Sequence, residues 1–265
     1  MPFYVAAGWS FAALFLLDLI AGALMASRSL VDLVSRVLCQ GVAFVAVLAG
    51  MAAVHDKGKR PAEIFAFRRV DVLPSVIAIT LGVALEGPLS LVANFIYTRY
   101  PPAEQELAEI ASLFDVRALY QKIGLVVAAG LMGPFVEELF FRGALFGGLA
   151  RKYGSVGALC ATTLLFAAAH RDLRTFLPDL LGGAAMGMLR LWSGSLWPGV
   201  LVHIAFNTSS ALYGVLYGPD GDLFTPAQSF GASATAIALL IAFRAIAQRS
   251  RQAREARAQD RGPAS

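Results

Sequence analysis

The chain has 265 residues, of which 57% are hydrophobic and 15% are charged, and its mean hydropathy is +0.65. An ordinary soluble domain has about 45–50% apolar and about 25% charged residues, so this composition excludes a water-soluble globular protein and indicates a polytopic membrane protein. The formal net charge is +4. Because no aromatic residues are interleaved with the basic ones, we expect the lipid bilayer as a partner and no nucleic acid.

Hydrophobic segments follow one another along the chain, and a helix needs about 20 apolar residues to cross a bilayer. The candidates are 3–26, 37–54, 73–98, 123–150, 156–170, 177–192, 196–217 and 230–248, of which the fifth and sixth are short. We therefore predict an all-α membrane bundle of about eight transmembrane helices. It forms a single domain over residues 1–248.

Polar segments lie between and after the spans. Segments 55–71 and 98–122 have an amphipathic or helical spacing of apolar residues, and we expect surface helices there. The Arg-rich segment 249–265 is too polar to pack, so we predict a disordered tail. If the eight spans alternate, the basic residues of 55–71, the pair Arg151 and Lys152, and the tail lie on one side. The positive-inside rule assigns that side to the cytoplasm, and we expect a bacterial inner (plasma) membrane protein.

Three charged residues, Glu137, Glu138 and Arg142, lie in the middle of the fourth span. A charge at the bilayer centre costs about 2.5–3.5 kcal/mol on insertion scales, so these groups need partners. Glu138 and Arg142 are four residues apart and share a helix face, which predicts an ion pair, whereas Glu137 points about 100° away from Glu138. Glu137 is left without a local partner. An unpaired carboxylate inside a membrane indicates a functional site.

Two later spans also carry polar side chains. His170 follows Phe166 by one helical turn, so the aromatic ring can support the imidazole by packing against it. His203 and Asn207 are four residues apart and share one helix face. Polar groups on three apolar helices must face the interior of the bundle, so we expect them to meet. A carboxylate, two imidazoles and an amide can supply bases and oxyanion donors for the attack of water on a carbonyl group.

Structural roles are open for the same residue types. A histidine in an apolar helix often packs in the core, an intramembrane asparagine often joins two helices, and a Glu–Arg pair one turn apart is often structural. The other polar residues of the spans are interpreted as structural or interfacial; they are Asp18, Glu86, Asp179 and Arg190.

Three motifs resemble the signature motifs of a known family. They are EELFFR at 137–142, FAAAH at 166–170 and GSLWPGVLVHIAFN at 194–207. The same motifs, in this order and at similar separations, mark the CPBP family, which comprises type II CAAX prenyl endopeptidases and the bacteriocin-processing and abortive-infection membrane proteases. The motif region spans about residues 123–210.

The resemblance implies an intramembrane endopeptidase that cuts a membrane-associated protein or peptide. Glu137 and His170 would activate a water molecule, and His203 and Asn207 would form the oxyanion hole. Glu138 and Arg142 match the family's supporting pair. A prenylated CAAX substrate is implied for part of the family only, and because prenylation is mainly a eukaryotic anchor, bacteriocin or peptide processing fits equally well.

Alternatives to this mechanism remain open at the sequence level. Glu137, His170 and His203 could give zinc three ligands and an open fourth position. Because the chain has no H-E-x-x-H motif and Asn207 is a poor zinc ligand, we expect a site without metal or cofactor. The buried charges could also serve a transporter or ion-coupled carrier, although the chain lacks the repeated halves typical of carriers. A binding scaffold without proteolytic activity is a third possibility.

Overall fold

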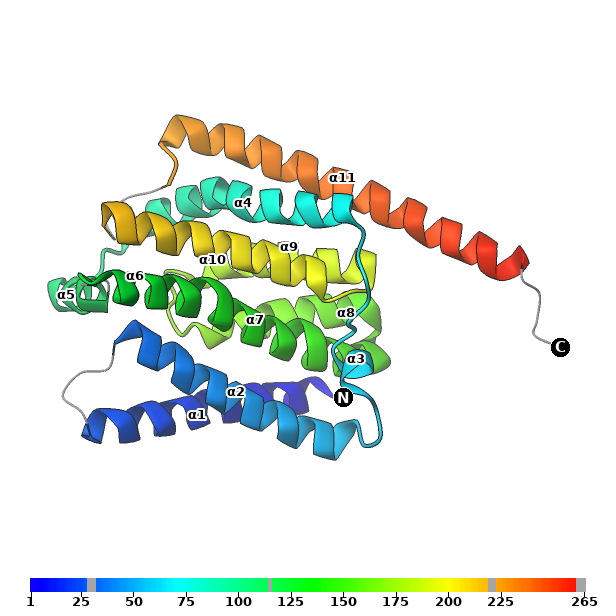
Figure 1. Ribbon diagram of the computed structural model, residues 1–265, viewed down its shortest axis with the longest axis horizontal. Helices are drawn as coiled ribbons and strands as arrows, with labels where there is room; N and C mark the ends of the chain where they lie inside the picture. Colours follow the sequence, from blue (N-terminus) through cyan, green and yellow to red (C-terminus); the bar gives the residue numbers. More distant parts are fainter. Residues whose placement is uncertain (28–31, 114–115, 219–222, 261–265) are drawn as a thin grey trace.

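The computed structural model describes residues 1–27, 32–113, 116–218 and 223–260, and the regular secondary structure within these ranges is helical. The helices lie side by side in a bundle, with α1 and α2 at one side, α4 and α11 at the other, and α7 to α10 between them (Figure 1). The long helices are α1 (Phe3–Ser27), α2 (Leu33–His55), α4 (Val72–Arg99), α8 (Phe146–Ala169), α9 (Phe176–Ser193), α10 (Trp197–Tyr217) and α11 (Pro226–Asp260). The shorter elements are α3 (Pro61–Ile64), α5 (Glu104–Leu113), α6 (Leu119–Leu125), α7 (Gly133–Glu138) and two π-helical segments, Val126–Met132 and Leu139–Leu145.

The predicted all-α polytopic bundle is confirmed. The predicted number of about eight transmembrane helices holds only approximately. Six helical stretches of the described residues are long and apolar enough to cross a membrane. One of them, Leu119–Ala169, contains the fourth and fifth predicted spans, which separate at Gly154, where φ is +71°. The chain folds back there, since the rings of Phe141 and Phe166 lie 5.4 Å apart. The sixth predicted span forms α9, which is not among the six stretches.

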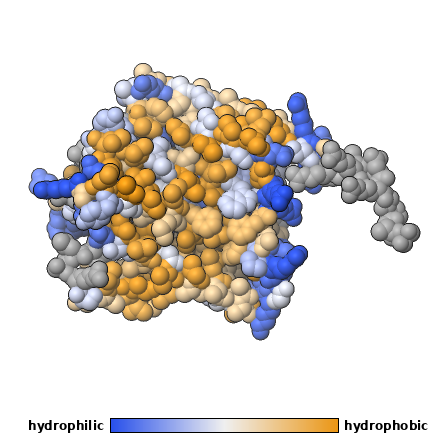
Figure 2. All heavy atoms as spheres, in the orientation of Figure 1, coloured by the Kyte–Doolittle hydropathy of each residue, from blue (hydrophilic) through white to orange (hydrophobic). Residues whose placement is uncertain are grey.

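The outside of the bundle is apolar. Figure 2 shows hydrophobic residues across the middle of the visible face and hydrophilic ones toward its ends. Large side chains such as Phe11 and Val42 are 70% and 60% exposed. A continuous apolar surface is unfavourable in water and suits contact with lipid, where the helices satisfy their own backbone hydrogen bonds.

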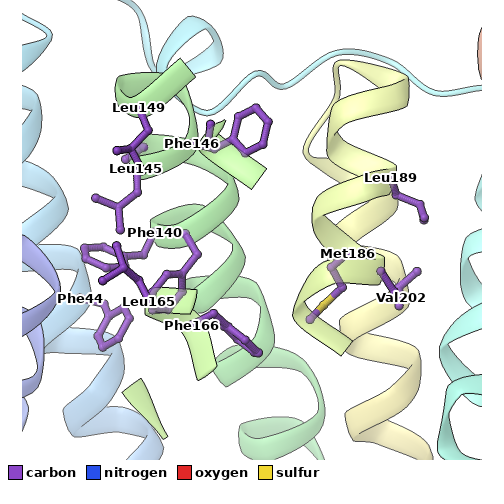
Figure 3. Close-up of a cluster of buried hydrophobic side chains, with 14 of the residues drawn as sticks. Phe44, Phe140, Leu145, Phe146, Leu149, Leu165, Phe166, Met186, Leu189 and Val202 are labelled. Carbon is purple, nitrogen blue, oxygen red and sulfur yellow. The ribbon is translucent and has the colours of Figure 1, made fainter. Parts of the chain in front are cut away.

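The core holds the helices of the three motifs together. Figure 3 shows Phe44 of α2, Phe140, Phe166 and Met186 among its buried side chains. Close helix contact depends on small residues. A Cβ atom at Gly82 would lie 2.4 Å from the backbone oxygen of Val202, so glycine lets α4 pack directly against the backbone of α10.

The three basic segments lie at one end of the bundle, as predicted. Asp56 accepts hydrogen bonds from Lys59 at 2.5 Å and from Arg151 at 3.1 Å, which joins segment 55–71 to α8. Arg69, Ala247 and Ser250 line one pocket, which brings the part of α11 where the Arg-rich segment begins to the same place.

The polar segments differ in part from prediction. Segment 98–122 contains the exposed helix α5, as expected, but segment 55–71 forms only the single turn α3, because Ala66 takes a left-handed conformation with φ +53°. Helix α11 continues to Asp260 and projects beyond the bundle (Figure 1), whereas a disordered tail was predicted from residue 249. Its Ala, Arg, Gln and Glu residues favour helix, and extending an existing helix avoids the cost of nucleation. Residues 261–265 lie outside the described residues.

Candidate active site

Helix α7 carries Glu137 and Glu138 between two π-helical segments, which occur frequently at functional sites. Oε1 of Glu138 accepts a hydrogen bond of 2.7 Å from Arg142, and neither side chain is exposed. The predicted ion pair is therefore confirmed. Arg142 also donates to the backbone oxygen of Gly183 at 3.0 Å, and its guanidinium lies 4.3 Å from the ring centre of Phe166. These contacts stabilise a cation that has no access to water.

His203 of α10 lies between the two carboxylates of α7. Its Nδ1 is 3.2 Å from Oε1 of Glu138, and its Nε2 is 3.7 Å from Oε2 of Glu137. The sequence predicted that the motifs would meet, and this imidazole is where they do. Its contact with Glu138 was not predicted, because helical spacing paired Glu138 with Arg142 alone.

Glu137 has its closest partner on another helix. Nε2 of Gln40, on α2, donates a hydrogen bond of 2.6 Å to Oε1 of Glu137. Sequence reasoning missed Gln40, and the available signal was a polar residue inside the apolar span 37–54. Glu137 thus lacks a partner on its own helix, as predicted, and is held by α2 and α10.

His170 ends α8, and the ring of Phe166 packs against it with centroids 4.8 Å apart, as the spacing predicted. Nδ1 of His170 lies 3.0 Å from the backbone oxygen of Phe166. In the neutral ring, an Nδ1–H that donates to this oxygen leaves Nε2 free to accept a proton. Oδ2 of Asp179 lies 3.7 Å from the same Nδ1, so a residue interpreted as structural or interfacial stands beside the predicted base.

One cavity of about 220 Å³ is lined by all four residues predicted to be catalytic: Glu137, His170, His203 and Asn207. The amide nitrogen of Asn207 donates to the backbone oxygen of Ala129 at 3.3 Å. Apolar side chains of α4, α9 and α10 form most of the remaining wall. The structure therefore places a carboxylate, two imidazoles and an amide around a space next to apolar surface.

The residues considered as zinc ligands can be located in the structure. Across the described ranges, no three His, Cys, Asp or Glu side chains are grouped so that they could hold a metal ion. Glu137, His170 and His203, the three ligands considered for zinc, do not form such a group. Nδ1 of His203 faces Glu138 and that of His170 faces a backbone oxygen.

Comparison with known proteins agrees with the motifs. Residues 120–209 match the family described as Type II CAAX prenyl endopeptidase Rce1-like. Over 84 residues the chain is 26% identical to a protein of Bacillus subtilis (strain 168) named "Putative membrane peptidase YdiL"; the match covers 32% of this chain and 34% of that protein. The chain thus aligns with about a third of the length of this relative. No solved structure matches the chain at a significant level. Together with the motifs, these matches support the assignment of the chain to the CPBP family of membrane peptidases.

Proposed function

We propose that the protein is an intramembrane endopeptidase that hydrolyses a peptide bond of a membrane-associated protein or peptide. The observation that carries the proposal is the shared cavity, whose wall includes Glu137, His170, His203 and Asn207. These residues come from α7, α8 and α10, so the site exists only in the assembled bundle.

Glu137 and His170 are the proposed bases. The hydrogen bond from Gln40 fixes one oxygen of Glu137, and the other remains available to take a proton from water. The backbone contact of His170 Nδ1 favours the ring form whose Nε2 accepts protons. Asp179, 3.7 Å from that Nδ1, would stabilise the ring once it is protonated. Its Oδ2 is buried and has no hydrogen-bond donor of its own.

His203 and Asn207 are the proposed oxyanion donors. A tetrahedral intermediate places negative charge on the former carbonyl oxygen, and donors held in advance stabilise that charge most in a site with little water. Asn207 has a second amide hydrogen besides the one directed at Ala129. Nδ1 of His203 donates to the carboxylate of Glu138, so Nε2 is proposed to donate to the substrate when the ring carries a proton on both nitrogens. Glu138 and Arg142 hold His203 in place and remain outside the reaction.

The proposed substrate presents an apolar side chain next to the bond that is cut. Leu85, Leu89, Met186 and Phe206 line the cavity beside the polar groups, and they favour such a side chain. Both a CAAX-type segment and a bacteriocin-like peptide fit this chemistry. The proposed location is the inner membrane of a bacterium, and the proposed mechanism uses no metal, because the water can be activated by Glu137 and His170.

The experiment is a comparison of membrane-derived peptides in cells that carry the parent protein, the variant Glu137→Gln, or neither. We expect new peptide termini with the parent only, and these would identify the substrate and the bond at once. Equal termini in all three samples, together with solute uptake by reconstituted vesicles, would contradict the proposal and favour a carrier that uses the same buried charges.

A further inference from the structure

Two cavities meet at the proposed bases. Besides the first cavity, a second one of about 170 Å³ lies against α1 and α2. The residues that line both are Glu137 and His170. The oxyanion donors His203 and Asn207 line the first cavity alone. The two groups proposed to activate water thus form a wall between two spaces, and the oxyanion donors lie on one side of it.

The second cavity has the size and the polar groups needed to hold water. A buried water requires about 10–15 Å³ of such volume and two to four polar partners, and an apolar cavity of this size stays dry. Here Gln40, Glu137 and His170 provide polar atoms in a wall that otherwise consists of side chains such as Leu14 and Leu17. The volume exceeds the requirement for one water about tenfold.

An exposed ion pair joins two residues that each follow a lining residue of this cavity in the sequence. Arg171 donates to both carboxylate oxygens of Asp18, at 3.0 and 2.8 Å, and joins α1 to the turn after α8. Asp18 follows the lining residue Leu17, and Arg171 follows the lining residue His170. The side chains of Asp18 and Arg171 are 57% and 48% exposed. This contact accounts for Asp18, an acidic residue in an otherwise apolar span.

We propose that the second cavity delivers the attacking water to Glu137 while the substrate occupies the first. This inference rests on the proposed function. A bound peptide with an apolar side chain displaces water from the first cavity, so the reacting water needs another route. It comes from the side of α1 and α2, and the carbonyl group lies on the side of α4, α9 and α10.

On this path, peptide hydrolysis has two steps. In the first, the water oxygen bonds to the carbonyl carbon, one proton of the water passes to Glu137, and the carbonyl oxygen takes up the negative charge beside His203 and Asn207. When the carbonyl forms again, the C–N bond breaks, and the proton held by Glu137 passes to the leaving nitrogen.

Cysteine labelling in lipid vesicles tests whether the second cavity contains water. The variants are Leu17→Cys, in the cavity wall, and Leu19→Cys on the same helix, which is 59% exposed on the outside of the bundle. The probe is a small, charged methanethiosulfonate reagent, and labelling is counted above that of the parent, which contains Cys39 and Cys160. We expect fast labelling of Leu17→Cys and none of Leu19→Cys, since lipid excludes the charge. Equal absence of labelling at both positions overturns the proposal.

Filling the cavity tests its role in turnover. The double variant Leu14→Phe/Leu17→Phe should lower kcat by about tenfold or more and leave KM unchanged, because it blocks water and not substrate. The control Leu19→Phe adds the same group on the lipid side and should leave both constants unchanged. Full kcat in the filled variant overturns the water path and leaves the protease intact. No cleavage by the parent overturns the proposed function itself, whatever the labelling shows.

Discussion

Nδ1 of His203 lies 3.2 Å from Oε1 of Glu138, the oxygen that also accepts the hydrogen bond of Arg142. One buried oxygen thus joins a cation of its own helix to an imidazole of α10. The ring of Phe166 contacts this group from a third helix, 5.6 Å from the ring of His203. Glu138 therefore joins the first motif to the third, and Phe166 of the second motif packs against both partners of Glu138. Glu137 lines the cavity.

Glu138→Gln is expected to act on stability. It leaves Arg142 as an unpaired cation without access to water, and breaking a buried pair in this way costs about 3–5 kcal/mol. Thermal unfolding of purified protein measures the loss. The matched control is Glu63→Gln, because Glu63 pairs with Arg60 where both side chains are at least half exposed, and such pairs contribute little. Equal unfolding temperatures for Glu138→Gln and the parent would contradict the assignment.

Glu137→Gln is expected to act on turnover. A positioned base contributes about 10²–10⁴-fold, and the amide oxygen of the variant can still accept the hydrogen bond from Gln40, so the fold should be retained. Cleavage rates and thermal unfolding, measured on the same preparation, separate the two effects. A variant with the cleavage rate of the parent would remove Glu137 from the mechanism.

His203→Ala and Asn207→Ala should each lower turnover by about 10²–10³-fold, the usual effect of one oxyanion donor. If both donors serve one developing charge, the double variant should lose less than the product of the single losses, because residues that act as a unit are non-additive. The double-mutant cycle of kcat provides the measurement. Losses that multiply strictly would argue against a shared oxyanion hole.

Chelators are expected to leave cleavage unchanged. In the proposed mechanism Glu137 and His170 deprotonate water without a Lewis acid. Rates measured before and after treatment with a strong chelator, together with elemental analysis of the purified protein, test this point. A loss of activity that zinc specifically restores would make His203 a candidate ligand instead of an oxyanion donor.

Arg174→Gln should lower stability at neutral pH and have less effect in acid. Arg174 donates to Glu106 of α5 and to Asp172, and these hydrogen bonds lower the pKa of both carboxyl groups. A lowered folded-state pKa means that the stabilisation is present above the ordinary carboxyl pKa and is lost as pH falls through the lowered value. Unfolding temperatures of parent and variant should therefore converge in acid. A difference that does not change with pH would assign the effect to packing.

The sequence by itself determined the class of fold and the local pairs. Apolar segments of membrane length predicted the helices, and helical spacing predicted both the ion pair of Glu138 with Arg142 and the packing of Phe166 on His170. These features depend on residues within one turn of each other, where the geometry of a helix leaves little freedom.

Only the tertiary structure decided which helices share a face of the site. Gln40 reaches Glu137 across 97 residues of sequence, and Asp18 meets Arg171 across 153. Periodicity shows which side of a helix is buried but not which neighbour covers it, since that choice depends on how all the helices pack. The second cavity has the same origin, because its wall combines α1 and α2 with the helices of the first and second motifs.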